Sequence, residues 1–160
     1  LKIFFGIFIV LASSRFIPHP PNFTSLIALS FYVPAIFGNR YIPIVLFCFV
    51  ITDMIIGFHN TIFFTWLSVL IIGYLSKYLN KNYFYRIGGA LTGAILFYLI
   101  TNFGVWILGG YDFTFDGLIT SYTMAIPFFG YTALSTIIFS FIIELVYKIV
   151  SLKKNKVFKY

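Results

Sequence analysis

The sequence predicts an all-α protein, an integral membrane domain built as a bundle of six transmembrane helices. Of the 160 residues, 61% are hydrophobic, 22% are aromatic and only 9% are charged. A soluble domain is about half apolar and about a quarter charged. Apolar runs such as IGGALTGAILFYLI and STIIFSFIIELV lack the alternation of transmembrane strands. Because lipid offers no partners to backbone groups, helices are the structure that remains.

Polar residues divide the chain into six apolar segments, each predicted to be one helix crossing the bilayer. The segments are residues 2–14, 23–37, 42–57, 61–76, 87–108 and 122–149. The first four are short of the ~20 residues that cross a bilayer, so we expect them to extend into flanking polar residues. A cleaved signal peptide is the alternative for 2–14. Residues 1–150 then form one transmembrane domain, and 151–160 form a basic cytoplasmic tail.

Lysines and arginines predict the orientation, because they favour the cytoplasmic side of a membrane. With six spans, Arg15 is alone on one side, and the other side receives Lys2, Arg40, Lys77, Lys81, Arg86, Lys148, Lys153, Lys154, Lys156 and Lys159. We therefore expect both termini in the cytoplasm and a multi-pass protein of the bacterial inner (cytoplasmic) membrane. Contact between these lysines and anionic lipid accounts for the net charge of +7, so no nucleic-acid partner is expected.

Residues 15–24, RFIPHPPNFT, form the first predicted external loop, which we call the strap. Its three prolines fix φ, remove three backbone donors and bias the preceding residues to extended geometry. The strap is therefore not helical, and we expect it to lie stiffly across the outer end of the bundle. A stiff loop positions side chains at low entropic cost, which suits a binding site. A plain connector is the alternative.

Unusual polar residues gather on the predicted outer side, and we interpret them as a ligand site. The predicted ligand-binding residues are Arg15, His19, Asn22, Asp53, His59, Asn102 and Trp106. Arg15 is expected to pair with a carboxylate or phosphate, which its guanidinium fork suits. The histidines and Asn102 would exchange hydrogen bonds with the ligand. Trp106, four residues after Asn102 on one helical face, would supply a stacking wall.

Several of these residues have a structural alternative. Asp53 costs ~2.5–3.5 kcal/mol inside a membrane, so it either partners Arg15 or a histidine, or contacts a ligand. Asn102 alternatively bonds a neighbouring helix. Trp66 and Tyr111 are expected in the interfacial aromatic belt.

Two small features complete this reading. Cys48 lies in the middle of a predicted span and is expected to be an inert core residue. Gly89 and Gly93, like Ala90 and Ala94, are four residues apart, which lets helices approach closely. We expect packing within the bundle, with docking of a partner subunit as the alternative.

The sequence predicts no enzymatic activity, no cofactor and no bound metal. HExxH, paired metal-ligand spacing and a nucleophile elbow are all absent, and Glu144 lies at the cytoplasmic end of the sixth span. Without a Walker A motif the chain cannot use ATP itself. One metal arrangement stays open, because two histidines and a carboxylate can bind zinc or iron, and His19, His59 and Asp53 supply these groups.

The blocks PHPPNFT, TDMIIGFH, ITNFGVW and AIPFFGYT give the chain a family resemblance. From about Arg15 to Tyr147 it resembles an uncharacterised bacterial family of small membrane proteins with these blocks, including the DxxxGFH pattern, and this resemblance implies no function. More weakly, it is similar to the S-components of energy-coupling factor (ECF) transporters. That resemblance implies six helices, a vitamin-like ligand held under the first external loop, and a transmembrane coupling subunit with ATPases. The AxxxA docking pattern common on the first helix of S-components is absent from KIFFGIFIVLA.

Together these observations predict a membrane-embedded substrate-binding or transport protein for a small vitamin-like or anionic nutrient. The expected partners are the lipid bilayer, the small-molecule ligand and, from the resemblance, a coupling subunit with ATPases. One alternative is a structural subunit of a larger membrane complex, which predicts an outer face sealed by polar self-pairing. The other is a membrane-embedded enzyme acting on a lipid or quinone, which predicts His19, His59 and Asp53 within reach of one metal or one substrate atom.

Overall fold

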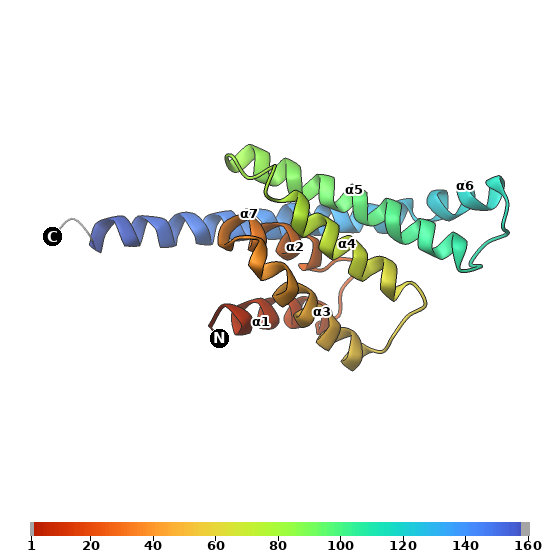
Figure 1. The fold of residues 1–160 in the computed structure, drawn as a ribbon, viewed down its shortest axis with the longest axis horizontal. Coiled ribbons are helices and arrows are strands. Elements are labelled where there is room, and N and C mark those ends of the chain that lie inside the picture. The colour runs from red at the N-terminus through yellow and green to blue at the C-terminus, as the bar shows by residue number, and fades with distance from the viewer. Residues whose placement is uncertain (1, 158–160) are drawn as a thin grey trace.

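A computed structural model describes residues 2–157 of the protein, and the side chains of residues 3–152. Within this part of the chain every regular element is a helix, which confirms the all-α prediction (Figure 1). The elements in order are α1 (Lys2–Phe16), α2 (Leu26–Phe37), the 3₁₀ turn η1 (Asn39–Tyr41), α3 (Ile42–Ile56), α4 (Ile62–Leu75), α5 (Tyr83–Ile107), α6 (Phe115–Met124) and α7 (Ile126–Val157).

Three stretches are long and apolar enough to cross a membrane, namely Asn39–Ile56, Tyr83–Ile107 and Ile126–Leu152. Three further apolar helices are shorter than the ~20 residues of a full span, and they are Ile3–Phe16, Leu26–Phe37 and Ile62–Leu75. These helices indicate a membrane protein. Six complete spans stay a prediction, and the lysine side chains of the tail, with residues 158–160, lie outside the described residues.

The helices run up and down around α5, which packs against α2, α4, α6 and α7, while α1 packs mainly against α3. Figure 1 shows the α1–α2, α3–α4 and α5–α6 connections toward one end, which we call the strap end. The α2–α3 and α4–α5 connections lie toward the opposite end, together with the start of α1 and the last turns of α7. We call it the lysine end, because Lys77 and Lys81 lie in its α4–α5 connection.

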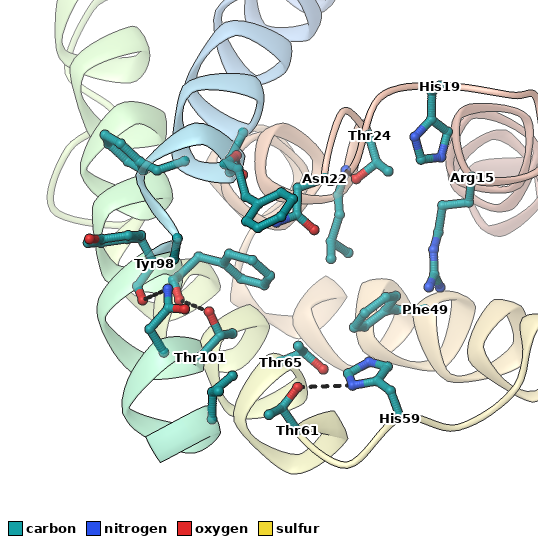
Figure 2. Close-up of a pocket in the computed structure, with 18 of the residues that line it drawn as sticks. Arg15, His19, Asn22, Thr24, Phe49, His59, Thr61, Thr65, Tyr98 and Thr101 are labelled. Atoms are coloured by element: carbon teal, nitrogen blue, oxygen red, sulfur yellow. Dashed lines mark hydrogen bonds between the residues drawn. The ribbon is translucent and has the colours of Figure 1, made fainter. Parts of the chain in front are cut away.

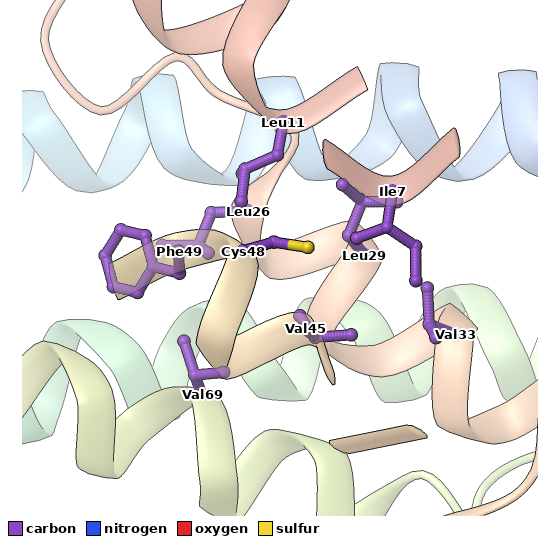
Figure 3. Packing of buried hydrophobic residues seen from close by; sticks show 9 residues of the cluster. All are labelled: Ile7, Leu11, Leu26, Leu29, Val33, Val45, Cys48, Phe49 and Val69. Atoms are coloured by element: carbon purple, nitrogen blue, oxygen red, sulfur yellow. The ribbon is translucent and has the colours of Figure 1, made fainter. Parts of the chain in front are cut away.

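The core contains two apolar clusters. The first joins α1, α2, α3 and α4, and consists of Ile7, Leu11, Leu26, Leu29, Val33, Val45, Cys48, Phe49 and Val69 (Figure 3). Cys48 has no exposed surface and is a free thiol among these aliphatic side chains. The second cluster joins α2, α4 and α5, and it includes Phe31, Ile72 and Ala94.

The small residues of α5 pack inside the bundle. Gly89, Ala90, Gly93 and Ala94 are all buried. A methyl group added at Gly93 would lie 3.0 Å from a side-chain carbon of Ile72 in α4, so the two helices approach as closely as glycine allows. The spacing therefore serves contact within the chain.

Most of the sixth predicted span, 122–149, lies in α7, but residues 122–124 are the end of a separate helix, α6, and the two helices meet at Ala125. Pro127 explains the break, since its ring has no N–H and clashes with the carbonyl four residues earlier in a continuous helix. Proline is tolerated in the first turn of a new helix. α6 also begins within the predicted loop, where Thr114 Oγ1 caps it by accepting the Gly117 N–H at 3.1 Å.

The first two residues of the strap, Arg15 and Phe16, belong to α1, contrary to the prediction. From residue 17 the strap is non-helical, as predicted, and turns sharply at its prolines. The Pro20 carbonyl accepts the Phe23 N–H at 3.0 Å, and Asn22 has a φ of +62°. A proline followed by a residue of positive φ, inside an i to i+3 hydrogen bond, is typical of a type II turn. The strap therefore has a defined shape.

The two ends of the strap are held together by serines. Ser14 Oγ and Ser25 Oγ lie 2.8 Å apart, and the Ser25 N–H donates to Ser14 Oγ at 3.1 Å. Ser25 is fully buried. This contact joins the end of α1 to the start of α2 and positions the neighbouring Arg15.

Candidate functional site

A cavity of about 510 Å³ opens at the strap end (Figure 2). Pockets of roughly 300–1,000 Å³ are typical of small-molecule sites. The strap, α3, the α3–α4 connection, α4, α5 and the start of α7 all contribute side chains. The cavity brings together five of the seven residues predicted from the sequence, which are Arg15, His19, Asn22, His59 and Asn102.

Asp53, the sixth predicted residue, lies behind Arg15 rather than in the cavity wall. Its Oδ1 is 2.7 Å from Nη2 of Arg15, and its side chain has no exposed surface. The indole N–H of Trp66 donates to its Oδ2 at 2.8 Å. Of the roles left open by the sequence, the structure gives Asp53 that of partner to Arg15. Trp66, which was expected in the aromatic belt, instead donates a hydrogen bond to this buried carboxylate.

Arg15 is fixed on several sides yet reaches the cavity. Its Nη1 donates to Thr52 Oγ1, and its guanidinium carbon lies 4.6 Å from the centre of the Phe49 ring. A guanidinium has five N–H donors, so these contacts leave some of them for a ligand. Because Asp53 balances the charge of Arg15, we expect recognition through aligned N–H groups rather than through a strong positive field.

The two histidines reach the cavity from different segments. His19, in the strap, has Nδ1 2.7 Å from the Pro20 carbonyl, which can only accept, so Nδ1 carries a proton. In the neutral ring Nε2 is then an acceptor. His59 Nδ1 lies 3.0 Å from Thr61 Oγ1 in the α3–α4 connection. Among the described side chains, no three His, Cys, Asp or Glu residues are grouped closely enough to hold a metal ion, so His19, His59 and Asp53 do not form the arrangement left open above.

Asn102 lines the cavity and is anchored within α5. Its Nδ2 donates to the Tyr98 carbonyl, one turn earlier, at 2.8 Å. This bond stays within α5, whereas the alternative reading expected a bond from the Asn102 side chain to a neighbouring helix. The amide oxygen of Asn102 stays an acceptor that a ligand can use.

Trp106, predicted as a stacking wall, does not line the cavity. Its indole N–H donates to the Asp112 carbonyl at 3.2 Å, and its ring stacks on Phe113 with centroids 4.5 Å apart and planes 6° apart. Gly109, with a φ of +82°, turns the chain just after α5 and folds this connection back onto Trp106. The aromatic surface of the cavity comes instead from Phe49, Phe97, Phe128 and Phe129.

A second ion pair, which is partly buried, lies toward the lysine end, and the sequence did not predict it. Arg86 of α5 grips Glu144 of α7 with two bonds, from Nε to Oε1 at 2.6 Å and from Nη2 to Oε2 at 2.7 Å. The Arg86 side chain is 16% exposed and that of Glu144 is 8% exposed. Neither residue lines the strap-end cavity.

Apolar helices, an end cavity and, among the described side chains, two partly buried ion pairs define a membrane-type helical protein with a candidate small-molecule site. The chain belongs to the family described as "Family of unknown function (DUF6580)", whose sequence profile matches residues 1–158. This match confirms the resemblance to an uncharacterised family. No curated protein and no solved structure matches the chain.

Proposed function

We propose that this protein is a multi-pass protein of the cytoplasmic membrane that binds a small anionic or polar nutrient at the strap end. One observation carries the proposal, namely the cavity of about 510 Å³ in which Arg15, His19, Asn22, His59 and Asn102 converge. A buried carboxylate fixes the arginine from behind. Such convergence of a few polar groups in a largely apolar pocket is typical of ligand sites.

The distribution of charge supports an external position for the cavity. Lys77 and Lys81 lie in the α4–α5 connection of the lysine end, whereas the strap carries Arg15. Because lysine-rich connections favour the cytoplasm, the strap would face outward. Both termini would then lie inside, with six apolar helices crossing.

The ligand's anionic or acceptor group would lie against Arg15. The N–H groups left by Asp53 and Thr52 would donate to it, as bidentate arginine contacts do. Asp53, held by Trp66, acts as a positioning residue because it fixes the plane of the guanidinium. The strap would cover the ligand, and release across the membrane would use a transmembrane coupling subunit with ATPases, as the weaker resemblance implies.

Native mass spectrometry of the protein purified from its own membrane tests this proposal. We expect a stoichiometric small mass on the wild type that is lost in Arg15→Ala. The matched control is Arg40→Ala, because Arg40 lies in η1, outside the cavity, against the Tyr41 ring. The control should keep the mass. A wild type without bound mass, or an Arg15→Ala variant that retains it, would contradict the proposal.

One observation favours a second candidate, a structural subunit of a larger complex. The strap end is partly sealed by its own polar contacts, Arg15 with Asp53 and Asp53 with Trp66, as that reading predicts. A stable co-purifying protein partner, with no small mass bound, would support it.

A further inference from the structure

The hydroxyl groups of the cavity point to the chemistry of the ligand. Thr101 Oγ1 donates to the Phe97 carbonyl at 2.7 Å, and Thr132 Oγ1 donates to the Phe128 carbonyl at 2.9 Å. Tyr98 Oη donates to the Tyr122 carbonyl at 2.6 Å, but it points away from the cavity (Figure 2). A hydroxyl has one proton and two lone pairs. Since each proton is already used within the protein, the hydroxyls of Thr101 and Thr132 can offer a ligand only their lone pairs.

The hydroxyls of Thr101 and Thr132, which we call the acceptor wall, lie on α5 and α7. Asn102 adds an amide oxygen as a further acceptor. One N–H of its amide is used on the Tyr98 carbonyl, and the other remains a donor. Figure 2 shows Tyr98 and Thr101 on one side of the cavity and Arg15 and His19 on the other. The cavity therefore has a donor side at Arg15 and an acceptor side at α5 and α7, with apolar side chains between them.

We infer that the ligand has two different polar ends, with a carboxylate or phosphate at one end and N–H or O–H donors at the other, joined by an apolar body. This inference rests on the proposed binding function and specifies the ligand class. The anionic end would face Arg15, and the donor end would face the acceptor wall. Phe49 and Phe97 would contact the body of the ligand. A cavity of 510 Å³ has the volume of roughly 17 water molecules at about 30 Å³ each, so a single substituted ring fits.

Three probes that share one ring separate the two ends. 4-(Aminomethyl)benzoate carries an anion and an ammonium donor, 4-ethylbenzoate keeps the anion but replaces the ammonium by a methyl group, and benzylamine keeps only the donor. We would measure the affinity of each for the full chain in lipid nanodiscs, by thermal shift against probe concentration. We expect 4-(aminomethyl)benzoate to bind about tenfold or more tightly than 4-ethylbenzoate, the scale of hydrogen bonds to a charged donor. Benzylamine should bind more weakly than 4-(aminomethyl)benzoate, because it leaves Arg15 without an anion.

The acceptor wall is tested by removing its hydroxyls at nearly constant shape. In the double variant Thr101→Val/Thr132→Val, the preference for the ammonium probe should fall to about threefold or less. Thr92→Val is the matched control on the same helix, because Thr92 makes the same type of bond, to Gly88, but lies outside this cavity. The control should keep the wild-type preference, and it also reports any general cost of the Thr→Val change.

The outcomes separate the ligand class from the binding function. If 4-ethylbenzoate bound as tightly as 4-(aminomethyl)benzoate or more tightly, or if the double variant kept the wild-type preference, the ligand class with an anionic end and a donor end would be overturned. The proposed binding function would still stand. If no probe binds, the molecule that co-purifies with the wild type decides, and a ligand without N–H or O–H donors would overturn the inference. No probe binding and no co-purifying molecule would overturn the proposed function, and with it this inference.

Discussion

Two arginine–carboxylate pairs hold this bundle, and they are built differently. At the strap end, Arg15 divides its donors between Asp53 and Thr52, and a single close contact of 2.7 Å joins it to the carboxylate. Toward the lysine end, Arg86 meets Glu144 through two bonds, at 2.6 Å and 2.7 Å. The first arginine lines a cavity, and the second does not.

This difference assigns the strap-end pair to a ligand site and the lysine-end pair to the structure of the bundle. The bidentate pair joins α5 to α7 and fills both oxygens of the Glu144 carboxylate. Both arginines keep N–H donors beyond these contacts, but only those of Arg15 lie at the cavity. The carboxylate beside Arg15 is held from behind by Trp66. We therefore expect changes at the lysine-end pair to affect mainly stability, and changes at the strap-end pair to affect mainly binding.

The largest effect on stability is expected from Glu144→Ala. This change leaves Arg86 without its partner, and breaking a buried pair typically costs ~3–5 kcal/mol. Because Arg86 is 16% exposed, we expect the lower end, about 3 kcal/mol, measured by denaturant unfolding in detergent. The double variant Arg86→Met/Glu144→Leu, which leaves no unpaired charge, should recover most of the loss. If the single and double variants lost the same unfolding free energy, the unpaired charge of Arg86 would not be the cause of the loss in Glu144→Ala.

An intermediate effect is expected from Trp66→Phe. The change removes the donor to Asp53 Oδ2, and an unsatisfied buried acceptor costs about 1–3 kcal/mol. We expect lower stability together with weaker retention of the co-purified ligand, because Asp53 then fixes Arg15 less firmly. Trp106→Phe is the matched control, since its indole N–H makes an exposed bond to the Asp112 carbonyl. Similar ligand loss in both variants would argue against a special role for Trp66.

The smallest effect is expected from Pro21→Ala in the strap. Proline at this turn position limits the unfolded chain, and its loss costs about 0.4–1 kcal/mol. We expect ligand affinity to fall by about twofold to fivefold, because a looser strap must be ordered on binding. Pro43→Ala, in the first turn of α3, should cost similar stability and leave affinity unchanged. Titration of the ligand against both variants checks this, and equal affinities would reduce the strap to a plain connector.

The sequence predicted the helices better than the contacts between them. Apolar runs and polar punctuation placed α3, α4 and α5 closely, and the prolines placed the strap. The polar residues of the strap and of the α3–α4 connection were expected at one site, because alternating helices bring these connections to one end. The break before α7 was missed, although Pro127 is visible in the sequence.

Contacts that depend on the rotation of a helix about its axis were not predictable. Helices that face lipid are apolar all round, so no polar face shows which side turns inward. The bond from Trp66 to Asp53 and the pair of Arg86 with Glu144 both depend on that rotation. The same holds for Thr101 of α5 and Thr132 of α7. Threonine is an ordinary residue in a membrane helix, so only the structure shows that these two line the cavity.

The most direct test of this division makes the same substitution in both pairs. Arg15→Lys and Arg86→Lys each keep the positive charge and remove the guanidinium fork. Unfolding free energy and the stoichiometry of the co-purified ligand would be measured for both, beside the wild type. We expect Arg86→Lys to lose stability and keep the ligand, because its two bonds to Glu144 need the guanidinium fork. We expect Arg15→Lys to lose the ligand and to lose no more stability than Arg86→Lys, because a lysine can keep the one charged contact to Asp53. The reverse pattern, or equal effects on both quantities, would contradict the assignment of the strap-end pair to binding and of the lysine-end pair to structure.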